Sequence, residues 1–473
     1  MLFNSFAFAI FLPIVFTLYW ALPHRFRWVL LLVASYYFYM SWNAKYVVLI
    51  ATTTLVSYIC AILIEKTEKN MHKRLFLIMA LVVSFGILYL FKYYNFSMDL
   101  IERFVPITAP RYNFLLPVGI SFYTFQTVSY VIDVYRGKVM AEKNLGIYAT
   151  FVSFFPQLVA GPIERTANLM PQINSEKKFN YESAKYGVRL ALWGLFKKMV
   201  IADNLAIWVD RVYGNVSSYE GCSLAVAAFF FSIQIYCDFS GYSDIARGTA
   251  KLMNIELMQN FRSPYFSASI KEFWNRWHIS LSTWFRDYVY IPLGGNKVSK
   301  GRNIVNYMIT FLVSGLWHGA NLTFIVWGGI HGVGQAFEKA FSTDKQDKRG
   351  IYWAIRVICV FAFVSVAWVL FRASDLNEAL YVLRHSLTGV TNIKAYIKSG
   401  AIALGISRWI AMKVVLLYLA PLFIYDFISL KIDICDWIGR RHLAIRYAYI
   451  GVIILAILTM GYVGQSTFVY FQF

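Results

Sequence analysis

The chain has 473 residues, of which 59% are hydrophobic and only 15% are charged. A soluble protein of this length needs more polar surface and has shorter apolar runs, so the composition excludes an ordinary soluble enzyme. The net charge of +20 is compatible with nucleic-acid binding, but the distribution of the basic residues argues against that function.

Lys and Arg gather in short connectors between apolar runs. The connectors are HRFR from His24, EKTEKNMHKR from Glu65, NKVSKGR from Asn296, DKQDKR from Asp344 and RRHLAIR from Arg440. Such clusters are typical of cytoplasmic loops, where they contact anionic lipid headgroups. They could equally attract an anionic cytosolic substrate. We therefore expect membrane lipid as a partner and no nucleic acid.

Apolar runs near the membrane-spanning length of about 20 residues recur along the chain. The clear runs are Phe3–Leu22, Tyr46–Ile64, Leu75–Tyr93, Leu224–Tyr236, Tyr352–Phe371, Val414–Leu430 and Tyr447–Tyr462. Less regular runs are Val29–Trp42, Phe114–Val134, Gly146–Pro162, Tyr186–Val200, Ile304–Leu316 and Ala320–Phe337. They predict an all-α polytopic membrane protein with roughly 11–13 segments, some of them short or re-entrant. The first run lacks a basic n-region and a cleavage site, so we expect a retained helix.

We expect one transmembrane domain over residues 1–473, in three sections. Residues 1–110 and 341–473 are predicted to form scaffold helices, and residues 111–340 a catalytic core. In the core section Pro, Gly, Trp and charged residues interrupt the apolar runs. At membrane depth such residues persist only where they are buried in protein or line a wet cavity. No internal repeat is visible, which weighs against a secondary transporter.

Several common chemistries find no support in the sequence. The five cysteines are scattered, without the spacing of a metal site, a redox pair or a disulfide framework. The chain contains no P-loop, no dinucleotide-binding fingerprint and no G-x-S-x-G nucleophile elbow. We therefore expect no metal and no permanently bound cofactor, and the remaining candidates are buried histidines.

The stretch WNRWHISLSTWFRDYVYIPLGGN, residues 274–296, holds the first candidate histidine. On one helix, Trp274, Trp277, His278 and Leu281 would share an aromatic and apolar face. The segment is predicted to be amphipathic and re-entrant or interfacial, ending at Pro292. A Trp-rich interfacial anchor, in which His278 only bonds a carbonyl group, is the structural alternative.

The stretch SGLWHGANLTFIVWGGIHG, residues 314–332, holds two more histidines. Gly319 follows His318 and allows close approach of a backbone or ligand, while Trp317 offers a flat wall. A neutral imidazole, with an ordinary pKa of about 6.5, is suited to act as a general base, although a core histidine is the alternative. On a continuous helix His331 would lie about 220° around and about 20 Å along from His318, so we expect it to be supporting or structural.

Asp238 and Asp244 lie beside an apolar run, in YCDFSGYSDIARG. A carboxylate there must pair with a cation or face water, and the pattern favours a structural ion pair over a catalytic acid. Nearby cations are Arg247, Arg276 and Arg286. Glu164 and Arg165, and likewise Asp133 and Arg136, are expected to pair locally or face the cavity.

Several long motifs, in order, resemble the membrane-bound O-acyltransferases, and more narrowly the bacterial alginate O-acetyltransferase branch. The motifs are FNSFAFAIFLPIVFTLYWALP, LPVGISFYTFQTVSYVIDVYRG, FPQLVAGPIER, DFSGYSDIARG, FWNRWHISLSTWFRDYVYIPLGGN, GLWHGANLTFIVWGGIHG and FVYFQF. The resemblance implies a ring of helices around a thinned centre with two funnels. It places the family's invariant histidine at His318 and the second active-site position at His278.

The resemblance also implies the chemistry. Acetyl-coenzyme A would be the acyl donor, His318 the general base or the assistant in forming an acyl-enzyme, and His278 a group that orients the donor, stabilises the oxyanion or shares the proton. Which histidine takes which role stays open at this point. The residues that we expect to bind substrate or support the histidines are Trp277, Trp317, Asn321, Asp238, Arg276, Arg286 and Ser282.

The resemblance further implies a bacterial inner-membrane location and a separate extracytoplasmic partner of the lipase-like hydrolase type. Terminal aromatic residues are candidates for docking it: Phe468, Tyr470, Phe471 and Phe473. The acceptor stays open among alginate, cellulose, peptidoglycan and other surface glycans. The alternatives are a D-alanyl transferase of teichoic acid synthesis, against which YIPLGGN after WFRDY argues, a transporter or flippase for a lipid-linked sugar, and a scaffold of an export complex.

Overall fold

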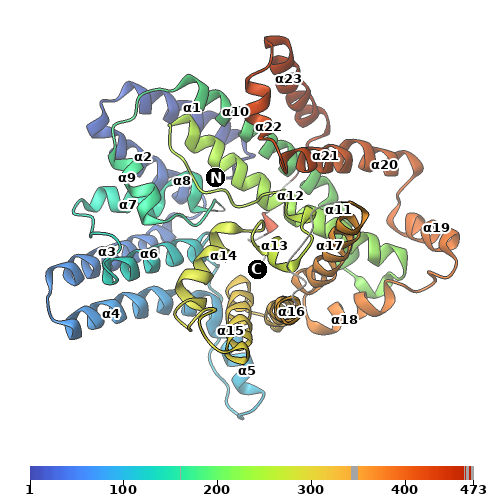
Figure 1. Ribbon diagram of the computed structural model, residues 1–473, viewed down its shortest axis with the longest axis horizontal. Helices are drawn as coiled ribbons and strands as arrows, with labels where there is room; N and C mark the ends of the chain where they lie inside the picture. Colours follow the sequence, from blue (N-terminus) through green and yellow to red (C-terminus); the bar gives the residue numbers. More distant parts are fainter. Residues whose placement is uncertain (160, 342–349, 463, 465–467, 470–473) are drawn as a thin grey trace. The chain divides into compact units, whose positions relative to one another are not determined.

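The computed structural model describes residues 1–473 except 160, 342–349, 463, 465–467 and 470–473. The described residues are helical throughout their regular elements and contain no β-strand. The chain divides into two compact units, the first formed by Met1–Ala191 with Tyr242–Gln259, the second by Leu192–Gly241 with Asn260–Phe473. Figure 1 labels the helices of both. The division into two scaffolds and a catalytic core stays a prediction.

The first unit is built mainly from the N-terminal helices. They are α1 (Phe6–Ala21), α2 (His24–Met40), α3 (Val47–Lys66), α4 (Asn70–Leu88), α5 (Tyr94–Glu102), α6 (Ile120–Tyr135), α7 (Leu145–Ser153), α8 (Phe155–Leu158) and α9 (Thr166–Asn174). Helix α3 packs against α4 and α6, and α2 packs against α7 (Figure 1). Two helices contribute residues to both units: α10 (Tyr181–Leu195) and α12 (Cys222–Leu252).

The second unit holds all three candidate histidines. Its helices are α11 (Asp203–Tyr213), α13 (Ile270–Trp274), α14 (Ile279–Phe285), α15 (Lys300–His318), α16 (Leu322–Ala340), α17 (Gly350–Arg372), α18 (Leu376–His385), α19 (Ile393–Leu404), α20 (Arg408–Lys413), α21 (Ala420–Ser429), α22 (Ile434–Gly439) and α23 (Leu443–Met460). Three π-helical segments join them: η3 (Phe196–Ala202), η6 (Arg286–Tyr290) and η7 (Val414–Leu419).

Glycines bring α15 and α16 into backbone contact, and the two helices lie side by side in Figure 1. A Cβ atom on Gly315 would lie 2.2 Å from the carbonyl oxygen of Phe324, and one on Gly328 would lie 2.2 Å from that of Phe311. Small residues are what permits helices to pack this closely at membrane depth. The hairpin therefore depends on the absence of side chains at these two positions.

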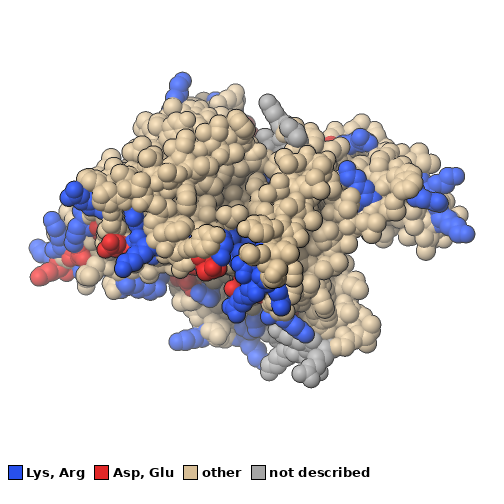
Figure 2. All heavy atoms as spheres, turned by 90° about the horizontal axis from the view of Figure 1, so that it is seen from above, with Lys and Arg blue, Asp and Glu red and all other residues tan. Residues whose placement is uncertain are grey.

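Six helical segments in the described part of the chain are long and apolar enough to cross a membrane. They are Ala44–Lys66, Asn70–Glu102, Cys222–Leu252, Gly350–Arg372, Arg408–Ser429 and Leu443–Met460, with Phe6–Ala21 as a shorter apolar helix. Large apolar side chains such as Val82 and Leu458 are 64% and 76% exposed. In Figure 2 the Lys and Arg spheres gather in groups, and the surface between them is mostly uncharged. These features confirm an all-α, multi-pass membrane protein.

The other predicted segments are shorter than expected or interrupted. The run Gly146–Pro162 is divided at Phe154 into α7 and α8. The run Phe114–Val134 becomes helical only at Ile120, after Gly119 with φ of 76°. At Gly119 a Cβ atom would lie 2.5 Å from the carbonyl oxygen of Leu158, so both the conformation and the space require glycine.

Candidate active site

His318 is the last residue of α15, and its side chain is surrounded by aromatic rings. The ring centroid of the imidazole lies 5.0 Å from that of Trp317, 5.1 Å from that of Trp327 and 5.3 Å from that of Phe371. The residue is 3% exposed. Gly319 follows because a Cβ atom there would lie 2.1 Å from the Phe324 ring. The close neighbour at this glycine is thus a ring of α16.

His278 occupies a sharp turn between α13 and α14. Its φ and ψ are 43° and 54°, a left-handed conformation that is unfavourable for a residue with a side chain. Such strain persists only where the surroundings enforce it, and it is common at functional sites. Here Asn260 holds the turn: its carbonyl oxygen accepts from the Ile279 N–H at 2.9 Å, and its Oδ1 accepts from the Ser280 N–H at 3.2 Å.

The prediction of one continuous helix through this stretch is wrong. The helix ends at Trp274 and a new one begins at Ile279, because Asn260 satisfies the first N–H groups of α14 and so permits the interruption. The expected aromatic and apolar residues are nevertheless buried, with Trp277 1% and His278 0% exposed.

Trp317 connects the two candidate catalytic histidines. Its ring centroid lies 6.3 Å from that of His278 and 5.0 Å from that of His318. The two imidazoles therefore cannot lie further apart than the sum of these distances. Burial lowers the pKa of His278 to about 3, so this imidazole is neutral at physiological pH. A neutral imidazole has one nitrogen that donates a hydrogen bond and one that accepts.

His331 lies closer to His318 than the sequence suggested. The interruption falls between the end of α15 at His318 and the start of α16 at Leu322, so the assumption of a continuous helix is wrong. The Trp327 ring contacts both imidazoles, at centroid distances of 5.1 Å for His318 and 5.0 Å for His331. His331 accepts through Nδ1 from the Trp274 indole N–H at 3.2 Å, which places its own proton on Nε2. It thereby ties α13 to α16.

A cavity of about 470 Å³ lies next to this group, lined by residues of α13, α14, η6, α15 and α16. It reaches Ile279, which adjoins His278, and Ser314, which lies one helical turn before His318 on the same face. Two predicted supporting residues, Ser282 and Arg286, line it. Lys271 adds a second positive charge to the lining, so a ligand that carries phosphate groups would be attracted here.

Three other predicted supporting residues have structural contacts. Trp277 packs on Trp368 with ring centroids 5.0 Å apart. Arg276 forms an ion pair with Glu272 at 2.8 Å within α13 and the following turn. Asn321 caps α16 by accepting from the Thr323 N–H at 3.1 Å, and its amide donates to the Ser374 carbonyl oxygen at 2.7 Å.

The expected arginine partners of Asp238 are wrong. Asp238 Oδ1 lies 2.7 Å from Lys198 Nζ, which also lies 2.7 Å from Asp203 Oδ1, and Asp238 Oδ2 accepts from the Val469 N–H at 2.7 Å. Asp244 does pair with Arg247, at 3.6 Å. Lys198 lies in η3, and sequence reasoning missed it. The signal was present, since Lys197 and Lys198 interrupt an otherwise apolar run and a charge at such a position needs a partner.

Glu164 is fully buried in the first unit and accepts hydrogen bonds from the Asn168 amide, at 2.7 Å, and the Met258 N–H. Burial raises its pKa to about 7, more than these hydrogen bonds lower it. In the part of the chain that the structure describes, no three His, Cys, Asp or Glu side chains gather as a metal site requires.

Of the terminal aromatic residues, only Phe468 is described. It is 0% exposed and contacts Phe239 with ring centroids 5.8 Å apart. Phe239 in turn lies 4.6 Å from the His278 ring. Tyr470, Phe471 and Phe473 lie outside the described residues.

Helices that cross a membrane and two occluded histidines beside a cavity with basic residues define a class of integral membrane enzyme that works on a ligand at membrane depth. The family model of the membrane-bound O-acyltransferases matches residues 143–371. The chain is 40% identical over 383 residues to the probable alginate O-acetylase AlgI of Pseudomonas putida, covering 80% of this chain and 78% of that protein. The chain belongs to the membrane-bound O-acyltransferase family and is an O-acyltransferase.

Two further relatives differ in the acceptor or the group in their names. The peptidoglycan O-acetyltransferase of Helicobacter pylori is 37% identical over 422 residues, which cover 81% of this chain and 79% of that protein. The teichoic acid D-alanyltransferase of Streptococcus thermophilus is 33% identical over 260 residues, which cover 52% of this chain and 61% of that protein.

Proposed function

We propose that the chain transfers an acetyl group from cytosolic acetyl-coenzyme A to a hydroxyl group of an extracytoplasmic polysaccharide. The relatives named for alginate and peptidoglycan O-acetylation support both the group and the class of acceptor. The observation that carries the proposal is the position of His278 and His318 against the same Trp317 ring, beside a cavity with Lys271 and Arg286 in its wall.

The chemistry needs a base and a stabilised oxyanion. An imidazole nitrogen takes the proton of the acceptor hydroxyl while the new C–O bond forms, the C–S bond breaks, and the departing thiolate receives a proton. We assign the base to His318, and to His278 the orientation of the thioester and a hydrogen bond to the developing oxyanion. An acyl-enzyme route would use the same base twice. A thioester is already activated, so the protein supplies position and proton transfer.

The phosphates of the donor would lie near Lys271 and Arg286, which line the cavity, because charge-assisted hydrogen bonds to phosphate are strong. The acceptor would approach from the outer side of the bacterial inner membrane. We further propose that a separate extracytoplasmic protein of the lipase-like hydrolase type completes transfer to the glycan. Alginate, peptidoglycan and related glycans share the necessary sugar hydroxyl groups.

Acetyl transfer is favoured over D-alanyl transfer, because the acetyltransferase relatives match 80% of this chain and the D-alanyltransferase matches 52%. A transporter or flippase for a lipid-linked sugar is a different class of protein. It would move its substrate without any acyl chemistry, and a scaffold would leave acetylation unchanged when either histidine is replaced.

The test uses the full chain in lipid vesicles with acetyl-coenzyme A carrying a radiolabelled acetyl group. We expect His318→Ala to lower hydrolysis or transfer of the label by about 10²–10⁴-fold, the usual contribution of a general base. His72→Ala is the matched control, because His72 is exposed and lies in a connector helix end remote in sequence from the site. Full activity of His318→Ala would refute the assignment, and glycan movement that it leaves intact would support the transporter.

A further inference from the structure

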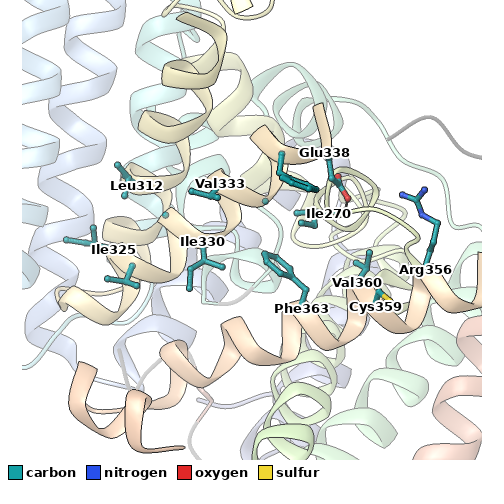
Figure 3. A pocket seen from close by; sticks show the side chains of 14 residues that line it. Ile270, Leu312, Ile325, Ile330, Val333, Glu338, Arg356, Cys359, Val360 and Phe363 are labelled. Atoms are coloured by element: carbon teal, nitrogen blue, oxygen red, sulfur yellow. Dashed lines mark hydrogen bonds between the residues drawn. The ribbon is translucent and has the colours of Figure 1, made fainter. Parts of the chain in front are cut away.

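A long apolar groove runs between α16 and α17 on the second unit. It has a volume of about 760 Å³, within the range of ligand-binding pockets. Twelve of its fourteen lining residues carry no charge, among them Ile325, Ile330, Val333 and Phe363. Figure 3 shows these side chains along the groove, with Ile325 toward one end and Glu338 and Arg356 toward the other. The groove thus has an apolar length and one charged end.

The length of the groove matches one leaflet of a bilayer. Its lining on α16 extends from Ile325 to Glu338, which is about 20 Å at the rise of an α-helix. One leaflet contributes about 15 Å of hydrocarbon to the membrane core. Val333 and Phe337 are each 59% exposed, so the groove is open along its side. An extended acyl chain fits this shape, and a compact polar ligand does not.

The charged end has a positive character. The Glu338 carboxylate accepts from the N–H groups of Ile270 and Lys271 at 2.7 and 3.0 Å, so the N-terminus of α13 compensates its charge. Arg356 donates through Nε to the Ala268 carbonyl oxygen at 3.0 Å, which fixes the guanidinium at this end. The connector between α16 and α17 has the basic sequence DKQDKR, which predicts the cytoplasmic side, where anionic lipids are concentrated.

The groove also adjoins the candidate active site. Ile270, the first residue of α13, lines it. Phe363, another lining residue, has its ring centroid 5.6 Å from that of His331, which ties α13 to α16. A molecule in the groove would therefore contact the helix that precedes the His278 turn.

We propose that this groove binds one anionic phospholipid, with an acyl chain along α16 and the phosphate headgroup at Arg356. The bound lipid completes the packing of α13, α16 and α17 from the membrane side. Because the proposal concerns lipid binding alone, its failure would leave the acyl-transfer assignment untouched.

Native mass spectrometry of the full chain, purified with phosphatidylglycerol or phosphatidylcholine, tests it. We expect one retained phosphatidylglycerol, and occupancy about fivefold lower in Arg356→Gln, the effect of one basic side chain at an anionic headgroup. Arg408→Gln removes the same charge from an exposed position on α20 and should bind like the natural chain. Retention that Arg356→Gln leaves unchanged, equal retention of phosphatidylcholine, or a second copy of the chain in place of lipid would overturn the proposal.

A second pair of variants tests the apolar part without changing charge. A Cβ atom on Gly329 would meet only Leu312 Cδ2, at 3.6 Å, so alanine fits there. Leucine at the same position would extend into the groove. We expect Gly329→Leu to lower phosphatidylglycerol retention and Gly329→Ala to preserve it; equal retention in both would contradict the assigned position of the chain.

Cys359 provides a third readout, because it lines the groove and is exposed, whereas the other four cysteines are buried. Bound phosphatidylglycerol should slow modification of Cys359 by N-ethylmaleimide, and phosphatidylcholine should not. The protection should disappear in Arg356→Gln. Modification at the same rate with either lipid would place the bound lipid elsewhere and refute the site.

Discussion

Replacing Lys198 with methionine tests the buried ion pairs of the second unit directly. Lys198 Nζ lies 2.7 Å from one oxygen of each of Asp203 and Asp238, and the three side chains are 1%, 3% and 1% exposed. Removing one partner of a buried pair costs about 3–5 kcal/mol, because a charge is left uncompensated in a low-dielectric environment. Two carboxylates lose the same cation here, so we expect a loss near the upper end, about 5 kcal/mol.

The assay is equilibrium unfolding of the purified chain in mixed micelles, followed by tryptophan fluorescence. The matched variant replaces Lys198 with methionine and both Asp203 and Asp238 with asparagine, which removes the charges together. We expect it to recover most of the lost stability, because no unpaired charge then remains. A loss below about 1 kcal/mol for Lys198→Met, the range of exposed pairs, would refute the reasoning. So would a triple variant no more stable than the single one.

Three further predictions concern the glycine contacts, the His278 turn and pH. Gly315→Ala should greatly lower the yield of folded protein, measured by size-exclusion chromatography, because its Cβ atom would lie 2.2 Å from a carbonyl oxygen, while Gly301→Ala, with nothing within 4 Å, should not. Asn260→Ala should cost about 1–3 kcal/mol by leaving the buried Ser280 N–H unpaired, and should lower kcat; Asn260→Asp, which keeps the acceptor, should lose less. Burial raises the pKa of Glu164 from 4.5 to about 7, so its stabilising contribution is present below pH 4.5 and is lost as pH rises through about 7. The Tm of the natural chain should therefore fall more between pH 5 and 8 than that of Glu164→Gln, and parallel profiles would contradict this.

Composition and apolar runs were enough to predict an all-α membrane protein and to single out His278 and His318. A run of apolar residues specifies a membrane helix locally, and an imidazole within one is conspicuous because its burial is costly. Trp317 was also predicted as a supporting residue, and it contacts both rings. The ring of helices with two funnels stays a prediction.

Features that depend on contacts distant in sequence could not be predicted. The left-handed backbone of His278 depends on Asn260, and no local pattern reveals which residue will accept the N–H groups of α14. The same holds for Asp238, whose cation comes from η3 rather than from a neighbouring arginine. The proximity of His331 to His318 depends on a chain reversal between α15 and α16, where sequence reasoning had assumed one helix.

The wall of the 470 Å³ cavity and the supports of the histidines are largely different sets of residues. Gln335 and Ser314 line the cavity but make none of the contacts that fix the imidazoles, which come from Asn260 and from close-packed rings. Substitutions in the wall can therefore change the size of the acyl group that is admitted while the proton-transferring groups stay in place. Donor preference can thus diverge among descendants of one ancestral enzyme without rebuilding its reaction centre.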